Sequence, residues 1–331
     1  MRERKLGGTG PSVAELGLGC MGMTGVYGPA DAREGIATIH AALDRGITLL
    51  DTGDFYDSGR NELLLREALR GRSRERIVLS VKFGEQRDPQ GGWSGCDNRP
   101  KAVKNFLAYS LGRLGTDYID IYRPARLDPD VPIEDTIGAM AELVQAGYVR
   151  HIGLSEVGSE TIRRAAAVHP ICDLQIEYSL ISRSLEAQVL PTCRQLGIAI
   201  TAYGVLSRGL LSGHWSRERN AAGDRRGQMP RFSRANLERN LALVEALRAV
   251  AETKGVTVAQ IATAWVAAQG EDILPLVGAR RLDQLEEALG SLAVRLTARD
   301  LARIEQAVPP GAAAGARYPE PAMLHLDSER G

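Results

Sequence analysis

The feature that most constrains the fold is a short apolar run that recurs along the 331-residue chain, often just after a glycine that ends an amphipathic stretch, as at Gly115 and Gly197. Glycine suits the left-handed backbone conformation that closes a helix. Apolar runs of about four to six residues, without alternating polar positions, indicate strands buried on both faces, as in a parallel sheet. Eight such strands are predicted, most of them followed by a helix: residues 16–19, 48–51, 77–82, 119–123, 152–155, 174–177, 198–202 and 273–277.

Eight β/α units predict an α/β fold in which the strands close into a (β/α)₈ (TIM) barrel, an arrangement that takes about 250 residues. The remaining residues are assigned to an N-terminal segment (4–13) that would form a hairpin across the barrel bottom, to two long loops and to a C-terminal tail. The alternative is a doubly wound sheet in two domains. No linker or change of composition divides the chain, so we expect one barrel domain over residues 1–331.

The glycines of residues 17–22 match the GxGxxG pattern of dinucleotide-binding Rossmann folds. That pattern requires a helix that begins at the glycines. Gly25, Gly28 and Pro29 would interrupt such a helix. We therefore interpret the segment as a strand that enters a glycine-rich loop at the end of the barrel where the strands finish, which we call the mouth.

Composition excludes several classes of partner. The 41 Lys and Arg residues balance the 41 Asp and Glu residues, which gives no electrostatic sign of nucleic-acid binding. No apolar run reaches the roughly 18–20 residues that span a bilayer, and the first residues lack a secretory signal. We expect a cytoplasmic protein with a small-molecule substrate and no bound metal; nothing in the sequence indicates its oligomeric state. Four scattered cysteines are expected to be reduced thiols: Cys20, Cys96, Cys172 and Cys193.

Three chemically active residues, Asp51, Tyr56 and Lys82, stand at or just after the ends of two predicted strands. Catalysis in such barrels takes place at the C-terminal ends of the strands, so we expect these side chains to converge at the mouth. An ammonium beside a phenol lowers the phenol pKa, which is about 10 when unperturbed. With Asp51 holding Lys82, Tyr56 would be a general acid for a carbonyl oxygen near neutral pH. Otherwise Lys82 and Asp51 would be a structural ion pair, and Tyr56 an aromatic of the pocket wall.

This pattern resembles the Asp–Tyr–Lys set of the aldo-keto reductase superfamily, and further motifs extend the resemblance from Leu6 to about Leu326. The motifs lie at residues 153–156, 174–179, 202–213 and 276–287. The segment 317–319 is also similar to a bacterial branch of the family. The resemblance implies an oxidoreductase with a nicotinamide cofactor.

By this resemblance, Ser155 and Gln175 would hydrogen-bond the nicotinamide carboxamide, and Tyr203 would stack on the nicotinamide ring. NADPH is the expected cofactor, because the guanidinium of Arg280 suits the adenosine 2′-phosphate. Alternatively, Arg280 belongs to the solvated start of a helix. The other implied cofactor residues are Leu206, Ser207, Arg208 and Gly209 at the pyrophosphate, Gln284 beside the 2′-phosphate, Glu287 at the adenine, and Gly278 in the last motif.

The resemblance fails at Ala125, which stands where the family usually has a His that binds the substrate carbonyl. Loss of one donor to a developing oxyanion typically costs about 10²–10³ in rate, which need not abolish turnover. We expect hydride transfer between NADPH and an aldehyde or ketone, with Tyr56 as general acid. The alternative is an NADPH-binding regulatory protein on the same barrel with little or no carbonyl turnover.

Two long loops are expected to shape the substrate pocket. Loop 84–99 would overhang the mouth, and loop 213–234, rich in arginine, would be either a clamp over the cofactor or a plain solvated loop. The arginines concerned are Arg217, Arg219, Arg225, Arg226 and Arg231, beside Trp215. The candidate pocket walls are Tyr27, Phe55, Trp93 and Ala125, although the three aromatics could equally be ordinary packing or surface residues.

Overall fold

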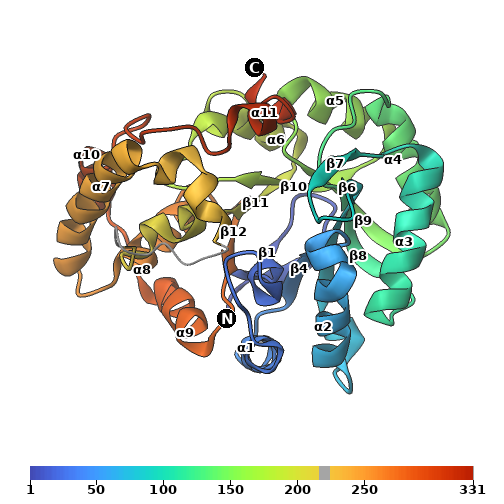
Figure 1. Ribbon diagram of the computed structural model, residues 1–331, viewed down its shortest axis with the longest axis horizontal. Coiled ribbons are helices and arrows are strands. Elements are labelled where there is room, and N and C mark those ends of the chain that lie inside the picture. Colours follow the sequence, from blue (N-terminus) through green and yellow to red (C-terminus); the bar gives the residue numbers. More distant parts are fainter. Residues whose placement is uncertain (216–223, 331) are drawn as a thin grey trace.

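Eight parallel strands close into a barrel in the computed structural model, which describes residues 1–215 and 224–330 (Figure 1). The order around the barrel is β10, β11, β12, β3, β4, β5, β8, β9, so the predicted (β/α)₈ fold is confirmed and the Rossmann alternative is excluded. The strands are β3 (Gly17–Gly19), β4 (Leu49–Gly53), β5 (Val78–Phe83), β8 (Ile119–Pro124), β9 (Val149–Ser155), β10 (Ile171–Glu177), β11 (Ala199–Tyr203) and β12 (Ile273–Gly278).

Helices surround the barrel, and several begin and end where the sequence predicts (Figure 1). Thr257 and Gln260 form a complete capping box, and Gly115 and Gly197 adopt the left-handed conformation after α3 and α6. The helices are α1 (Ala32–Asp44), α2 (Arg60–Leu69), α3 (Pro100–Leu114), α4 (Ile133–Gln145), α5 (Ser159–Val168), α6 (Val189–Leu196), α7 (Arg234–Glu252), α8 (Val258–Ala267), α9 (Leu282–Gly290), α10 (Ala298–Ala307) and α11 (Glu320–Met323).

The N-terminal hairpin closes the bottom of the barrel, as predicted. Its strands β1 (Glu3–Lys5) and β2 (Ser12–Ala14) pair antiparallel. Leu6 and Val13 are buried in one cluster with the first inward-facing residues of the barrel strands, such as Leu49 and Ile121. This end of the barrel is therefore closed by a packed apolar plug.

Two segments meet above the mouth. Loop 84–99 contains an antiparallel hairpin, β6 (Glu85–Arg87) and β7 (Trp93–Cys96), which the sequence analysis missed because the strands are short and rich in polar residues. The C-terminal tail passes from α10 to α11, near α5 and α6 (Figure 1). The ring of Trp93 packs against that of His325 of the tail in a tilted arrangement, with 4.6 Å between ring centroids, so the hairpin and the tail support each other.

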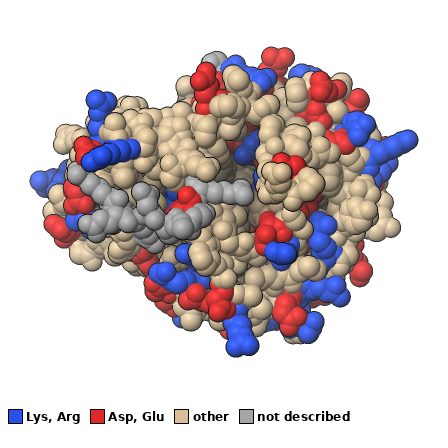
Figure 2. Space-filling view, in the orientation of Figure 1, with Lys and Arg blue, Asp and Glu red and all other residues tan. Residues whose placement is uncertain are grey.

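Charges of both signs are mixed on the face of the molecule that Figure 2 shows. Figure 2 shows Lys and Arg mixed with Asp and Glu over the visible face, as the balanced composition predicts. Over the described ranges, no helix combines the length and the apolar character that a bilayer crossing requires. Those same ranges contain no group of His, Cys, Asp and Glu side chains arranged to hold a metal ion.

The upper half of the barrel interior is polar rather than apolar. The inward-facing residues there include Asp51, Ser80 and Lys82, followed around the barrel by Arg123 and Asp173, all buried. Buried charges are stable only when they are paired. Space for these pairs is made partly by Gly153, since a Cβ there would lie 2.6 Å from an oxygen of Asp173 and 3.1 Å from the guanidinium carbon of Arg123.

Replacing Gly153 with alanine is expected to lower the free energy of unfolding by about 1–3 kcal/mol, because the added methyl overpacks a closed polar core. The control is Gly138→Ala on α4, where a Cβ would meet nothing within 4 Å and a stabilisation of about 0.5–1 kcal/mol is expected. Urea unfolding of both variants measures the difference. Wild-type stability for Gly153→Ala would contradict this account of the barrel interior.

Candidate active site

The mouth holds a buried ion pair between neighbouring strands. Lys82, on β5, donates a hydrogen bond to Asp51, on β4, and the two residues are only 4% and 3% exposed. The hydroxyl of Ser80 and the side-chain amide of Gln175 both donate to the second oxygen of Asp51, each at 2.7 Å. The carboxylate thus accepts three hydrogen bonds, which satisfies it inside the barrel.

Tyr56 lies directly beside this pair. It begins a short 3₁₀ helix, η2 (Tyr56–Gly59), which follows β4, and the Lys82 ammonium nitrogen lies 5.0 Å from the centroid of its ring. The next two residues, Asp57 and Ser58, have positive φ values of 47° and 52°, which turn the chain sharply. The structure therefore brings Asp51, Tyr56 and Lys82 together at the mouth.

The predicted lowering of the Tyr56 pKa is wrong for this structure. Burial raises the pKa of the Tyr56 phenol well above its ordinary value, and the charges of Asp51 and Glu85 raise it further. The Lys82 ammonium is bound to Asp51, and burial lowers the pKa of Lys82 itself. Tyr56 is therefore protonated at neutral pH, the state that a proton donor needs.

The residues expected at the nicotinamide lie at the mouth together with the Asp51–Lys82 pair. Ser155 and Gln175 are paired in register at the ends of β9 and β10, and both are buried. Because Gln175 uses its amide nitrogen on Asp51, its oxygen is left to accept. Tyr203 ends β11, and its hydroxyl donates to Glu156 at 2.7 Å, which fixes the ring. A hydroxyl, an amide oxygen and a fixed aromatic ring fit a carboxamide-bearing ring.

Backbone strain is concentrated in the loops of the mouth. The non-glycine residues with positive φ in the described ranges all follow β4, β9 or β11. After β11 the turn η5 (Ser207–Ser212) begins with Ser207 and Arg208 at φ values of 45° and 58°, followed by Gly209 at 94°. Leu206 precedes this turn and its carbonyl accepts from the N–H of Gly209 at 2.9 Å. Such strain is characteristic of binding sites, because only the surrounding structure can hold it.

The residues expected at the adenosine end lie after β12. The side-chain oxygen of Gln284 accepts from the backbone N–H of Arg280 at 3.1 Å, so the two are neighbours as predicted. The guanidinium of Arg280 donates to the carbonyls of residues 27 and 29 at 3.4 and 3.2 Å. Gly278 has open space around it, which a flat ligand could occupy. Glu287, on α9, lies 3.7 Å from His214.

The candidate pocket walls have different environments. The ring of Phe55 packs edge-on against Tyr56, with 4.9 Å between centroids. Tyr27 is partly buried, and burial raises the pKa of its phenol to about 12. Ala125 directly follows β8 and is fully buried. Its N–H donates to the carbonyl of Phe83, the last residue of β5, at 2.8 Å. Trp93 is 42% exposed on the hairpin and contacts the tail instead.

The sequence analysis gave no role to a second buried charge cluster at the mouth. Glu156 is fully buried and accepts two hydrogen bonds from Arg317 of the tail, at 2.9 and 2.6 Å. Burial alone would raise the pKa of Glu156, but Arg317 lowers it to about 2. The adjacent Tyr318 hydroxyl lies 3.1 Å from that of Tyr203. In the sequence, only the similarity of segment 317–319 to a bacterial branch of the family indicated that the tail matters here. The structure shows that this segment contacts Glu156 and Tyr203 at the mouth.

The arginine-rich loop packs against the strained turn. Arg226 donates to the carbonyl of Arg208 at 3.0 Å, and its guanidinium lies 5.1 Å from the ring of Tyr27. Arg231 is buried and donates to Ser182 at 2.7 Å. These two arginines are not part of a solvated surface. Arg217, Arg219 and the side chain of Arg225 lie outside the described residues.

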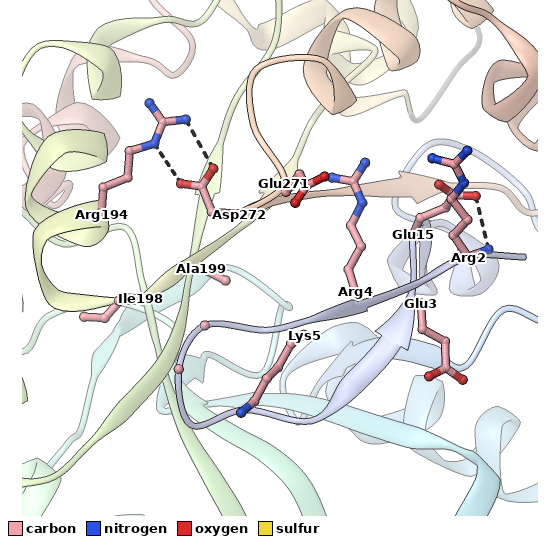
Figure 3. Close-up of a pocket in the computed structure, with 13 residues that line it drawn as sticks. Arg2, Glu3, Arg4, Lys5, Glu15, Arg194, Ile198, Ala199, Glu271 and Asp272 are labelled. Carbon is pink, nitrogen blue, oxygen red and sulfur yellow. Dashed lines mark hydrogen bonds and ion pairs between the residues drawn. The ribbon is translucent and has the colours of Figure 1, made fainter.

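A separate cavity of about 660 Å³ opens at the bottom of the barrel (Figure 3). It lies between the N-terminal hairpin and the starts of β11 and β12. One ion pair lies in its lining, between Arg194 and Asp272 at 2.8 Å. Because the apolar plug separates this cavity from Asp51 and Tyr56, it is not part of the candidate active site.

Comparison with known proteins decides the family. The model of the aldo/keto reductase family matches residues 15–309. The chain belongs to this family. Its members are oxidoreductases that use nicotinamide cofactors on carbonyl compounds and alcohols, and this activity agrees with the polar, strained mouth of the barrel.

Known aldo-keto reductases resemble this chain over nearly its whole length. It is 42% identical over 317 residues to "Probable aldo-keto reductase 1" of Glycine max, covering 95% of this chain and 91% of the relative. The glycerol dehydrogenase AKR11B4 from Gluconobacter oxydans has a similar structure, with a TM-score of 0.84 and 27% identity over 92% of this chain and 94% of that one. The structure of the aldo-keto reductase AKR11C1 from Bacillus halodurans, in its holo form, is also similar, with a TM-score of 0.77. The two chains are 29% identical, and the match covers 96% of this chain and 98% of that one.

One buried carboxyl at the mouth is expected to dominate the pH dependence of stability. Asp54 is 7% exposed, and its oxygens accept no hydrogen bond from side chains in the described residues. Burial, and then the charge of Glu62, raises the pKa of Asp54 to about 8. The native state therefore binds more protons than the unfolded state between about pH 4 and 8, so this contribution to stability is lost as pH rises through 8.

The Asp54→Asn variant is expected to lose less stability than wild type between pH 5 and pH 9, because it has no carboxyl to ionise. Between pH 5 and the folded-state pKa of Asp54, the free energies of unfolding of the variant and of wild type are expected to diverge by at most about 1.4 kcal/mol per pH unit. Thermal and urea unfolding at the two pH values measure it. The exposed Asp130→Asn is the control and is expected to follow wild type. Parallel pH profiles for Asp54→Asn and wild type would show that this carboxyl titrates normally.

Proposed function

We propose that this chain is an NADPH-dependent aldo-keto reductase that transfers a hydride between nicotinamide and the carbonyl carbon of an aldehyde or ketone, with Tyr56 as general acid. The observation that carries this proposal is the buried Asp51–Lys82 pair beside a protonated phenol, at the carboxyl ends of the strands. The whole chain, residues 1–331, would act as one catalytic domain.

The cofactor residues are proposed from their positions around this group. When bound, NADPH supplies the hydride. Ser155 and Gln175 would hold the carboxamide, and the fixed ring of Tyr203 would support the nicotinamide. The turn at residues 206–209 would receive the pyrophosphate, while Arg280, with Gln284 and Glu287, would bind the adenosine end.

The proton would come from this chain. Tyr56 would donate its hydroxyl proton to the carbonyl oxygen, and the nearby Lys82 ammonium would stabilise the phenolate that remains. Asp51 keeps the ammonium in place. With Ala125 at the usual histidine position, the side chain there has no donor for the oxygen, which makes Tyr56 more important.

Ala125 also favours the alternative, a regulatory protein that binds NADPH with little or no turnover. Stopped-flow mixing of the NADPH-bound protein with a panel of aldehydes and ketones separates the two. Oxidation of bound NADPH by any of these carbonyls supports the reductase. Tight NADPH binding with no hydride transfer to any of them would favour the regulatory function.

The Tyr56→Phe variant is expected to reduce carbonyls at least about 100-fold more slowly, because general acid catalysis contributes at least that much. Its affinity for NADPH is expected to be nearly unchanged, since the phenol is not assigned to the cofactor. Steady-state rates and fluorescence titration measure the two effects. Tyr109→Phe, on the exposed face of α3, is the control. Full activity of Tyr56→Phe would remove this residue from the mechanism.

The Arg280→Met variant is expected to weaken NADPH binding about 10–100-fold while leaving NADH binding nearly unchanged, because only NADPH carries the 2′-phosphate that a charge-assisted hydrogen bond would hold. Titration with both cofactors gives the ratio of dissociation constants. The adjacent Arg281→Met, whose guanidinium is paired with Asp283 at 2.7 Å, is the matched control. Equal weakening for both cofactors would place Arg280 away from the 2′-phosphate.

A further inference from the structure

A second ion pair lies inside the barrel, beyond the residues assigned to the reaction. Arg123, on β8, and Asp173, on β10, are both 0% exposed, and their side chains are 3.0 Å apart. Apolar branched residues ordinarily fill such an interior, and burying two charges is costly even when they are paired. A fully buried pair at this place therefore calls for a reason other than simple packing.

The surroundings of Asp173 hold the pair in one position. The hydroxyl of Thr201 donates to Asp173 at 2.5 Å, and the thiol of Cys172 donates to its other oxygen at 3.2 Å. Gly153 leaves the space that the carboxylate and the guanidinium occupy. Neither charged side chain can move without losing these contacts.

Arg123 is less completely satisfied than its partner. None of its guanidinium nitrogens makes a hydrogen bond of standard geometry with the described residues. Its stabilisation is therefore mainly electrostatic. Burial alone would lower the pKa of Arg123, but the charges of Asp173 and then Asp51 raise it. The guanidinium is thus paired with Asp173 and also feels the charge of Asp51.

The pair also adjoins the lysine of the candidate site. Arg123 and Lys82 are partners in the register of β8 and β5. Lys82, Asp51, Arg123 and Asp173 thus form a group of alternating sign across the barrel interior, with one end at Tyr56.

We propose that Arg123, fixed by Asp173, is a positioning residue for the Asp51–Lys82 pair: it places a second cation next to Lys82, on the neighbouring strand, and so limits how strongly Asp51 holds the proton on Lys82. This inference rests on the proposed function of Tyr56 and Lys82. Asp173 serves as the counterion that keeps the guanidinium inside the barrel.

The sign of the effect follows from the charges around Lys82. Those groups are Asp51 on β4, Tyr56 on η2, Cys20 after β3, and Arg123 and Arg126 on and after β8. Burial, and to a lesser degree Arg123 and Arg126, lowers the pKa of Lys82, while Asp51 opposes them. Removing the charge of Arg123 should therefore raise the pKa of Lys82, by on the order of one unit for a charge several ångströms away.

The experiment replaces the pair without leaving a lone buried charge. The double variant Arg123→Met/Asp173→Asn is neutral in sum, and Arg123→Gln/Asp173→Asn is a second version in case the first fails to fold. Arg123→Lys keeps the charge. The control is Arg194→Met/Asp272→Asn, which removes an ion pair at the barrel bottom. Lys82 is then followed by NMR of ¹³C-labelled lysine, which is practical because the chain has few lysines: Lys5, Lys82, Lys101, Lys104 and Lys254.

We expect the Lys82 signal of the double variants to titrate at a higher pH than in wild type, because Arg123 is the nearer charge to Lys82; the shift is smaller than one pH unit, because the opposite charge of Asp173 is removed as well. The alkaline limb of the pH profile of kcat/KM should move in the same direction, with little change in NADPH affinity. Arg123→Lys and the control should titrate as wild type. Unchanged titration in the double variants, an equal shift in Arg123→Lys, or failure of both double variants to fold would overturn the positioning role.

Failure of the proposed function would have a different signature. If the wild type reduces no carbonyl, or Tyr56→Phe is fully active, the assignment of the reaction fails. The lysine titration needs no turnover and still reports whether Arg123 acts on Lys82. A wild type that is active with Tyr56 essential, combined with an unchanged Lys82 titration in the double variants, would reject the positioning role alone.

Discussion

The structure of the mouth depends on one buried ion pair, Asp51 with Lys82. Two charges removed from water are costly unless every polar atom finds a partner. Here the carboxylate also accepts from Ser80 and Gln175, which lie on strands on different sides of the barrel. The hydrogen bond from Gln175 therefore requires the closed barrel, because only closure brings β10 within reach of β4 and β5. It also fixes an ammonium beside the ring of Tyr56.

The two ends of the barrel interior differ in composition: the bottom is apolar and the top is polar. At the bottom, Leu6 and Val13 of the hairpin complete an apolar plug, which supplies ordinary hydrophobic stability. At the top, charged groups and strained turns replace apolar packing, and this region gives up stability for chemistry. Asp54 shows the cost in stability, since burial disfavours its ionised form and raises the pKa of its carboxyl far above the ordinary value.

The C-terminal tail is part of the mouth and not an appendage. Arg317 is buried at the mouth, where it pairs with Glu156, and Tyr318 contacts Tyr203, the residue proposed to support the nicotinamide. The tail also packs against the hairpin through His325. The hairpin and the tail therefore cover the mouth together, which suits the proposed hydride transfer, since such a site must exclude water.

The sequence by itself determined the eight strands and the hairpin plug, because strand patterns and helix caps are local features of the chain. It also determined the convergence of Asp51, Tyr56 and Lys82, because the general rule that barrel chemistry lies at the C-terminal ends of the strands applies to any such barrel. It missed the β6–β7 hairpin, whose polar strands carry no apolar pattern. It gave the wrong sign for the Tyr56 pKa, because burial depends on every element above the residue. The partners of Glu156, Arg123 and Asp173 were likewise decided only by the tertiary structure, since each ion pair joins residues that are distant in the chain and adjacent only when the barrel closes.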